Sequence, residues 1–313
     1  VLEVGIEDPD EPKDPETPHF IPAYSQKVKA SKEFQTFQFD HSFVLNSLKS
    51  SMEGYVFHNQ PLDTDDLLEQ TVKLFNSCKT SLELFDMLHN MRAYDDSTHA
   101  HSLNVALICR RIGKWLKVDA ATLDTLTLCG LLHDIGKLKI PDEILNKPDK
   151  YTDEEFDLVK RHTKFGYELL KTLNIDPHIK KAALLHHERC DGSGYPLKAT
   201  QKDLDDFSMV VAIADVYDAM TAARSYRAPL CPFQVIERFE QEGLQKYKPK
   251  FILTFLQHIA STYQNNRVLL SNGQSANIVM LNQQHLARPI VQLNDNSCID
   301  LSTRLDLHIQ SIL

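Results

Sequence analysis

Residues 131–137 read Leu-Leu-His-Asp-Ile-Gly-Lys and bring His133 and Asp134 to the end of an apolar helical run. Neighbouring residues on an α-helix lie about 100° apart around its axis, so both side chains can address one point in space. An imidazole nitrogen and a carboxylate suit a divalent metal, and the carboxylate has two oxygens with which to bridge two ions. On its own, the pair is equally compatible with an ordinary helix end before Gly136. Whether the pair belongs to a metal site or to an ordinary helix end therefore depends on the rest of the chain.

His101 is a second candidate ligand, because it shares an apolar helical face with Val105 and Ile108. A single histidine on such a face is more often a core residue with satisfied nitrogens than a metal ligand. His99, two residues earlier, is the alternative candidate for this ligand position. Its own helical face runs into Arg110 and is typical of a boundary between core and solvent, so we prefer His101.

His162 belongs to another predicted helix. Thr152 and Glu155 form a capping box that opens this helix, and its inner face continues through Val159 and His162 to Leu173. The ring of His162 is therefore expected to point inward. Taken alone, it too is more often a core residue than a ligand.

Two more histidines and an aspartate complete the candidate set. His186 and His187 end a helical run directly before the glycine-rich loop 188–200. Asp215 lies in the apolar segment FSMVVAIADVYDAM, where a buried carboxylate must be paired or bound to a metal. Asp218 shares the helical face of Asp215. It is a candidate for orienting a ligand or contacting a substrate.

Five histidines and two aspartates on five inward helical faces are hard to explain as independent accidents. Seven nitrogen and oxygen ligands suit a pair of divalent ions better than one tetrahedral zinc. Two such ions would lower the pKa of a water between them and supply hydroxide near neutral pH. The predicted metal centre comprises His101, His133, Asp134, His162, His186, His187 and Asp215.

The composition is that of an ordinary globular protein, with 313 residues, 42% hydrophobic and 25% charged. Every apolar run is shorter than the roughly 20 residues that a membrane-spanning helix needs, which excludes an integral membrane protein. A net charge of −9 excludes the broad positively charged surface to which duplex nucleic acid binds. The six cysteines form no CxxC motif and no secretory signal is visible, so we expect reduced thiols and a cytoplasmic location.

The chain divides into four segments by composition and periodicity. Residues 1–22 are acidic and rich in proline, which predicts a disordered arm. Helical periodicity runs through an N-terminal region at 23–94 and a catalytic domain at 95–262. Residues 263–313 contain short apolar runs bounded by turn residues, which predicts a small antiparallel β segment with Pro289 in an edge strand. The predicted fold is mainly α, with an N-terminal helical extension and a small C-terminal β appendix.

Three stretches carry a resemblance to a known family. The first is His133-Asp134-x-Gly136-Lys137, the second reads HHERCDGSGYP at 186–196, and the third reads DVYDAMTAARSYR at 215–227. Together they resemble the HD-GYP family, the branch of HD-superfamily metal phosphohydrolases that cleaves bacterial cyclic dinucleotides. The resemblance implies an HD-superfamily helical bundle. It also implies a phosphodiesterase that opens cyclic di-GMP to linear pGpG, with further hydrolysis to GMP left open and 3′,3′-cyclic GMP-AMP as an alternative substrate.

The resemblance further implies how the metal ligands divide. One ion would be held by His101, His133, Asp134 and Asp215, and the other by Asp134, His162, His186 and His187. Some family members hold a third ion through a glutamate four residues before the first histidine. Ser97 occupies that position here, so we expect two ions. Iron or manganese is expected, with zinc or nickel as alternatives.

The resemblance also implies catalytic and substrate-binding residues. Asp134 would act by bridging the metals, and Lys137 would reach a phosphate oxygen. The substrate contacts would be made by Lys137, Arg189, Tyr195, Asp218, Arg224 and Arg227. Tyr195 also offers an aromatic face on which a purine can stack.

Two other functions remain open from the sequence. One is an HD-type phosphohydrolase acting on another nucleotide, against which the loop at 188–200 argues. The other is a receptor or scaffold that binds a cyclic dinucleotide with little turnover, against which the intact ligand set and Lys137 argue. A homodimer or a signalling-protein partner is compatible with either.

Overall fold

The computed structural model describes residues 23–91, 94, 97–147, 149–222 and 230–313. The predicted arm at 1–22 and the candidate substrate residues Arg224 and Arg227 lie outside these residues. The helices are α1 (Ala23–Ala30), α2 (Lys32–His58), α3 (Thr64–Ser77), α4 (Ser81–Met91), α5 (Thr98–Trp115), α6 (Ala120–Leu132), the 3₁₀ helix η1 (Ile135–Lys139), α7 (Asp142–Leu145), α8 (Asp153–Lys160), α9 (His162–Leu170), α10 (Pro177–Leu185), α11 (Asp206–Thr221), α12 (Pro232–Lys246) and α13 (Pro249–Thr262). The strands are β1 (Arg267–Leu270), β2 (Ser275–Met280), β3 (Ile290–Leu293), β4 (Cys298–Asp300) and β5 (Ile309–Ile312). The predicted fold class, mainly α with a small β appendix, is confirmed.

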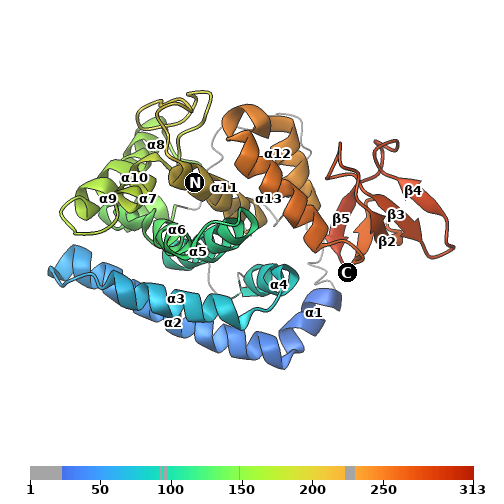
Figure 1. The fold of residues 1–313 in the computed structure, drawn as a ribbon, viewed down its shortest axis with the longest axis horizontal. Coiled ribbons are helices and arrows are strands. Elements are labelled where there is room, and N and C mark those ends of the chain that lie inside the picture. Colours follow the sequence, from blue (N-terminus) through green and yellow to red (C-terminus); the bar gives the residue numbers. More distant parts are fainter. Residues whose placement is uncertain (1–22, 92–93, 95–96, 148, 223–229) are drawn as a thin grey trace.

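Helices α5, α6 and α11 form the centre of the molecule, and α10 packs beside them on α6 and α11 (Figure 1). Each of the three central helices begins at a polar cap. Ser97, Asp119 and Asp205 each accept a hydrogen bond from the backbone amide three residues further on. The interior of α11 is buried along its whole length. These helices therefore form a rigid support for any side chain that they point inward.

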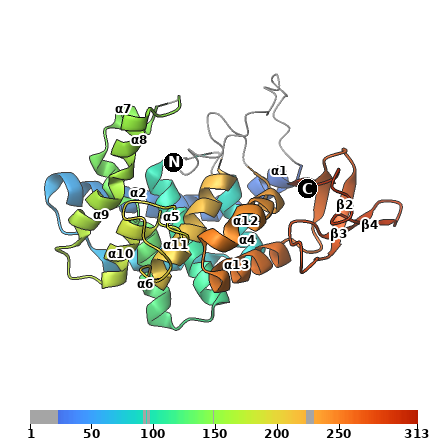
Figure 2. The same ribbon diagram turned by 90° about the horizontal axis from the view of Figure 1, so that it is seen from above.

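The N-terminal helices α2 and α3 lie along one side of this centre (Figures 1 and 2). The ring of His41 in α2 is buried, and its Nε2 lies 3.2 Å from the side-chain oxygen of Asn104 in α5. Near the other end of α2, the hydroxyl of Tyr55 donates to the carbonyl of Leu169. Among the described helices, none combines the length and apolarity needed to cross a bilayer.

The helix predicted to run from 153 to 173 is interrupted. The capping box of Thr152 and Glu155 is present and opens α8, but α8 ends at Lys160 and α9 begins at His162. The prediction of one continuous helix was wrong, because apolar periodicity does not register a one-residue break at Arg161. The break makes His162 the first residue of α9, with its Nδ1 2.7 Å from the carbonyl of Val159.

The strands form one antiparallel sheet in the order β4-β3-β2-β1-β5. It lies at the opposite end of the molecule from α8 and α9 (Figures 1 and 2). The placement of Pro289 in an edge strand was wrong, because β3 pairs with both β2 and β4. Pro289 immediately precedes β3, where its missing N–H costs no ladder hydrogen bond, and its carbonyl accepts from Leu301.

Candidate metal centre

His133 and Asp134 lie where the chain leaves α6 and tightens into η1. This turn packs closely against α9. A Cβ atom on Gly136 would lie 1.9 Å from the carbonyl oxygen of His162 and 2.4 Å from the amide nitrogen of Gly166. Only glycine permits this approach. The approach brings Asp134 next to His162.

The seven predicted ligands converge from α5, α6, α9, α11 and the turn after α10. Ligand atoms of Asp134, His162, His186 and His187 all lie within 4.8 Å of one another, and so do those of His101, His133 and Asp215. Asp134 stands between the two groups. Its Oδ1 lies 3.3 Å from His162 Nε2 and 3.6 Å from His186 Nε2, and its Oδ2 lies 3.2 Å from His133 Nε2 and 3.7 Å from His101 Nε2.

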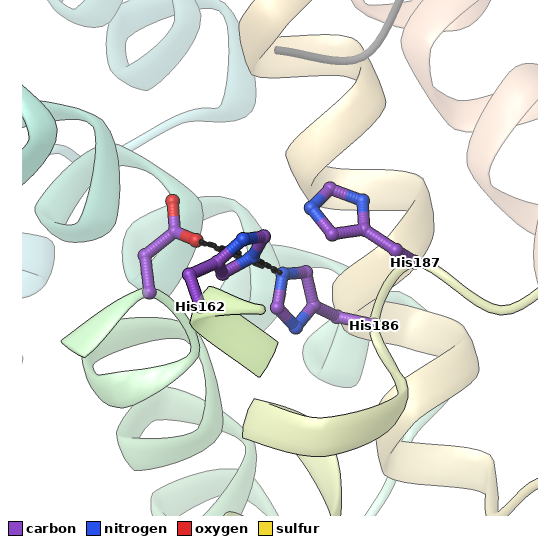
Figure 3. Close-up of side chains that lie close together, drawn as sticks. His162, His186 and His187 are labelled. Atoms are coloured by element: carbon purple, nitrogen blue, oxygen red, sulfur yellow. Dashed lines mark hydrogen bonds and ion pairs between the residues drawn. The ribbon is translucent and has the colours of Figure 1, made fainter. Parts of the chain in front are cut away.

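Backbone carbonyls fix the direction of three of the rings. The Nδ1 atoms of His133, His162 and His186 lie 2.7–2.9 Å from the carbonyls of the residues three or four positions earlier. A carbonyl can only accept, so each Nδ1 carries the proton and each Nε2 presents a lone pair to the cluster. His162 Nε2 and His186 Nε2 are 3.2 Å apart, and Figure 3 shows their rings turned toward each other. Two lone pairs at this distance repel unless a cation lies nearby.

The buried atoms of the cluster fit a divalent metal. His133 Nε2, Asp134 Oδ1, both ring nitrogens of His187 and Asp215 Oδ2 are buried with no hydrogen-bond partner among the described residues. Leaving so many polar atoms unsatisfied is costly, and bound cations would satisfy most of them, including one of the two ring nitrogens of His187. Imidazole and carboxylate donors suit iron, manganese, zinc or nickel. The buried His/Asp cluster thus indicates divalent metal binding.

The protonation states of three of the histidines agree with that chemistry. Burial lowers the pKa of His162 to about 3, and it lowers the pKa values of His186 and His187 as well. These rings are therefore neutral near pH 7, the form that binds a metal. Burial would raise the pKa of Asp134, but the neighbouring His133 and Lys137 outweigh it and hold that pKa well below its usual range.

His101 is oriented by a carboxylate instead of a backbone carbonyl. Its Nδ1 lies 2.8 Å from Asp218 Oδ2, and its Nε2 lies 3.0 Å from Asp215 Oδ1. Burial alone would lower the pKa of His101, but the hydrogen bonds with Asp215 and Asp218 raise it to about 9. Asp218 thus makes the kind of outer contact that fixes a metal-binding imidazole. The sequence prediction that Asp218 contacts substrate stays a prediction.

Replacing Asp218 with alanine is expected to weaken metal binding by about 10- to 100-fold, because His101 loses the partner that orients its ring. Titration of the metal-stripped protein with Mn²⁺ measures the affinity. Asp206→Ala is the matched control, since Asp206 lies on the exposed side of the same helix and pairs with Lys248. Unchanged affinity in the Asp218 variant would show that Asp218 does not orient His101.

The other predicted substrate residues have distinct surroundings. Lys137 is buried, with its Nζ 2.7 Å from Asp134 Oδ2. Arg189 donates to the carbonyls of His186 and Glu188 through Nη1, and its guanidinium lies 5.3 Å from the ring centre of Tyr247. These contacts hold the loop after α10 against the end of α12. Substrate binding by Arg189 remains a prediction.

Glu188 is a structural residue that the sequence analysis missed. It is buried, and its two carboxylate oxygens accept from the backbone amides of Leu197 and Ala199 at 2.6 and 3.0 Å. The available signal was an acid placed directly after two inward histidines. A buried acid at that position needs donors, and the amides of the following loop supply them. Ser97, where a third-metal glutamate would stand, caps α5.

The sequence model of the HD domain family matches residues 66–251, more than half of the chain. This chain belongs to the HD domain family. The match begins in α3, before the catalytic domain expected at 95–262, and ends in α13. The resemblance to HD-GYP proteins is confirmed by the relatives and the solved structure described next.

Two curated relatives are cyclic dinucleotide phosphodiesterases by name. A cyclic di-GMP phosphodiesterase of Thermotoga maritima is 35% identical over 178 residues, which cover 56% of this chain and 48% of the relative. A 3′3′-cGAMP-specific phosphodiesterase 2 of Vibrio cholerae is 34% identical over 183 residues, which cover 58% and 35%. The chain thus spans half or less of the length of both relatives.

Among solved structures, Bd1817, an HDG“Y”P protein from Bdellovibrio bacteriovorus, shares the fold with a TM-score of 0.51. The two sequences are 18% identical, and the match covers 75% of this chain and 78% of the Bd1817 chain.

Proposed function

We propose that this chain is a metal-dependent phosphodiesterase that hydrolyses a cyclic dinucleotide, either cyclic di-GMP or 3′,3′-cyclic GMP-AMP. The observation that carries the proposal is the position of Asp134, whose two oxygens face two separate groups of ligand atoms. This is the arrangement that a pair of ions needs when one carboxylate bridges them. The names of the relatives supply the substrate class.

The proposed roles follow from the contacts. His101, His133 and Asp215 would hold one ion, His162, His186 and His187 the other, and Asp134 would bridge them. When bound, the pair supplies Lewis acidity toward a phosphodiester and a water-derived nucleophile at neutral pH. The backbone-bonded Nδ1 atoms keep three imidazoles in the tautomer that presents Nε2. Ser193 donates its hydroxyl to Asp191, which fits a turn residue and not a nucleophile.

Lys137 has a separate role in the proposal. Its ammonium lies at the edge of the cluster beside Asp134, where it can donate to a non-bridging phosphate oxygen and neutralise charge that develops during hydrolysis. Lysine acts there as a point charge with three donors. Tyr195, Arg224 and Arg227 are proposed substrate contacts from the family resemblance.

The activity is tested directly by product analysis. Protein purified without oxygen is incubated with cyclic di-GMP and with 3′,3′-cyclic GMP-AMP in the presence of Mn²⁺ or Fe²⁺, and the products are separated by chromatography. We expect linear dinucleotide from at least one substrate, and mononucleotide if hydrolysis continues. A protein that holds its metals and binds a cyclic dinucleotide without cleaving it would be a receptor, and the proposal would be wrong.

Replacing Lys137 with alanine is expected to lower kcat by about 100-fold while both metals remain bound, because the variant loses a charge that acts on the phosphate. Steady-state kinetics and metal analysis of the same sample measure both quantities. Lys139→Ala is the matched control, since Lys139 is exposed two residues further along η1. Loss of metal from the Lys137 variant would contradict the assigned role.

The proposal also covers the identity of the metal, the cellular location, the segment that carries catalysis and the kind of partner. We propose iron or manganese as the resident metal, with zinc or nickel as alternatives that the same imidazole and carboxylate donors accept. Six free cysteine thiols support a reducing, cytoplasmic location. Catalysis is assigned to residues 95–262, which carry all seven candidate ligands. A second copy of this chain or a signalling protein is the proposed kind of partner.

A further inference from the structure

His187 differs from the other four histidines of the cluster. The Nδ1 atoms of His133, His162 and His186 face backbone carbonyls, and that of His101 faces Asp218. Neither ring nitrogen of His187 has a hydrogen-bond partner among the described residues. Its nearest carboxylate oxygen, Asp215 Oδ2, lies 3.7 Å from Nδ1. No hydrogen bond therefore fixes the rotation of this ring, although metal-binding histidines usually have one.

Aromatic contacts surround His187 instead. The ring of Tyr195 is stacked on it, with centroids 4.7 Å apart and planes inclined by 29°. The ring centroids of His186 and His162 lie 4.1 and 5.0 Å from that of His187. Figure 3 shows the three histidine rings grouped together. Phe156 of α8 meets Tyr195 nearly at a right angle, with centroids 6.3 Å apart. The imidazole thus lies between the other histidines and a tyrosine that is itself packed from outside.

The loop that carries Tyr195 is folded back onto His187 by its own backbone. The amide of Tyr195 donates to the carbonyl of His187 at 3.3 Å. The buried carboxylate of Glu188 holds the amides of Leu197 and Ala199. A Cβ on Gly194 would lie 2.4 Å from the Cα of Glu188, so glycine is required for this approach. The loop thereby fixes the distance between the tyrosine and the imidazole.

We infer that Tyr195 is a positioning residue for His187, and that its ring replaces the missing hydrogen bond by restricting the imidazole to the orientation that binds a metal. The inference rests on the proposed metal centre and not on the identity of the substrate. It gives the glycine-rich loop a role in metal binding in addition to the substrate contact expected from the family resemblance. Phe156 supports the tyrosine from outside.

The test compares three variants of the full chain. Tyr195→Leu removes the ring, Tyr195→Phe keeps the ring and removes the hydroxyl, and Leu197→Ser is the control at an exposed position of the same loop. Each metal-stripped protein is titrated with Mn²⁺ by equilibrium dialysis and metal analysis. Circular dichroism and the thermal midpoint of the metal-free proteins check the fold.

The wild type, Tyr195→Phe and Leu197→Ser are expected to bind two ions per chain with equal affinity. Tyr195→Leu is expected to bind its second ion about 10- to 100-fold more weakly. Its hydrolysis should show a lower kcat that excess metal restores, whereas loss of the substrate contact alone would raise KM and leave kcat insensitive to added metal. If Tyr195→Leu lowers the thermal midpoint of the metal-free protein by more than about 5 °C, Tyr195→Met is tested in its place. Methionine fills the loop without a ring, and the same weaker binding of the second ion is expected.

If Tyr195→Leu binds two ions with wild-type affinity and its only defect is a raised KM, the inference is wrong. Tyr195 would then be a substrate contact only. Failure of the proposed function has a different signature. A wild type that binds two ions and cleaves no cyclic dinucleotide refutes the proposed activity, while the titrations still decide the role of Tyr195. A wild type that binds fewer than two ions refutes both.

Discussion

Replacing Asp134 with asparagine is expected to remove both metals and to lower hydrolysis of a cyclic dinucleotide by roughly 10³-fold or more. The carboxylate faces both sets of ligand atoms, with Oδ1 toward His162 and Oδ2 toward His133. An amide keeps the shape of the side chain but is neutral and has one oxygen. It cannot serve both ions, and it also leaves Lys137 without its ion pair.

Metal analysis of the purified variant and the initial rate of hydrolysis test this expectation. Asp157→Asn is the matched control, because Asp157 is exposed on α8 and pairs with Lys160 on the surface. Circular dichroism should show that the helical content of both variants is unchanged. Two ions bound to the Asp134 variant would mean that the carboxylate does not bridge the metals.

Replacing Gly136 with alanine is expected to destabilise the protein by about 3 kcal/mol or more, because the new Cβ meets backbone that cannot move away easily. It would lie 1.9 Å from the carbonyl oxygen of His162 and 2.4 Å from the amide of Gly166. To relieve this contact, η1 must separate from α9. Since Asp134 and His162 lie on opposite sides of that contact, metal binding should weaken as well.

Denaturant unfolding of the metal-free protein measures the stability loss, and a Mn²⁺ titration measures the metal loss. Gly243→Ala in α12 is the control. There the nearest atom to the new Cβ would be 3.7 Å away, and alanine is expected to be neutral or slightly stabilising in a helix. Equal stability of the two alanine variants would refute the close contact between η1 and α9.

Much of the candidate site could be predicted from the sequence. The seven ligand residues lie on apolar helical faces or at helix ends, and inward-facing polar residues on several helices of one bundle tend to meet. His101 was preferred over His99 by this reasoning, and it is His101 whose ring lies beside Asp134 and Asp215. Asp218 was predicted to orient a ligand, and its carboxylate lies 2.8 Å from His101.

Other features depend on contacts that periodicity does not report. The break at Arg161 leaves the apolar spacing intact, so α8 and α9 were predicted as one helix. The contacts of Arg189 with two carbonyls and Tyr247 depend on how the loop returns to α12. Pro289 was assigned to an edge strand because proline lacks a backbone N–H, and β4, which pairs with β3, is a three-residue strand with little apolar signal. In each case the tertiary neighbour was decisive, and the local pattern could not specify it.

The central claim is that the cluster holds two divalent ions on either side of Asp134. Anomalous diffraction from crystals of the protein loaded with Mn²⁺ tests it most directly. We expect two peaks, one among His101, His133 and Asp215 and one among His162, His186 and His187, each about 2.0–2.3 Å from its ligand atoms and from one oxygen of Asp134. A single peak, or peaks that do not share the Asp134 carboxylate, would contradict this account.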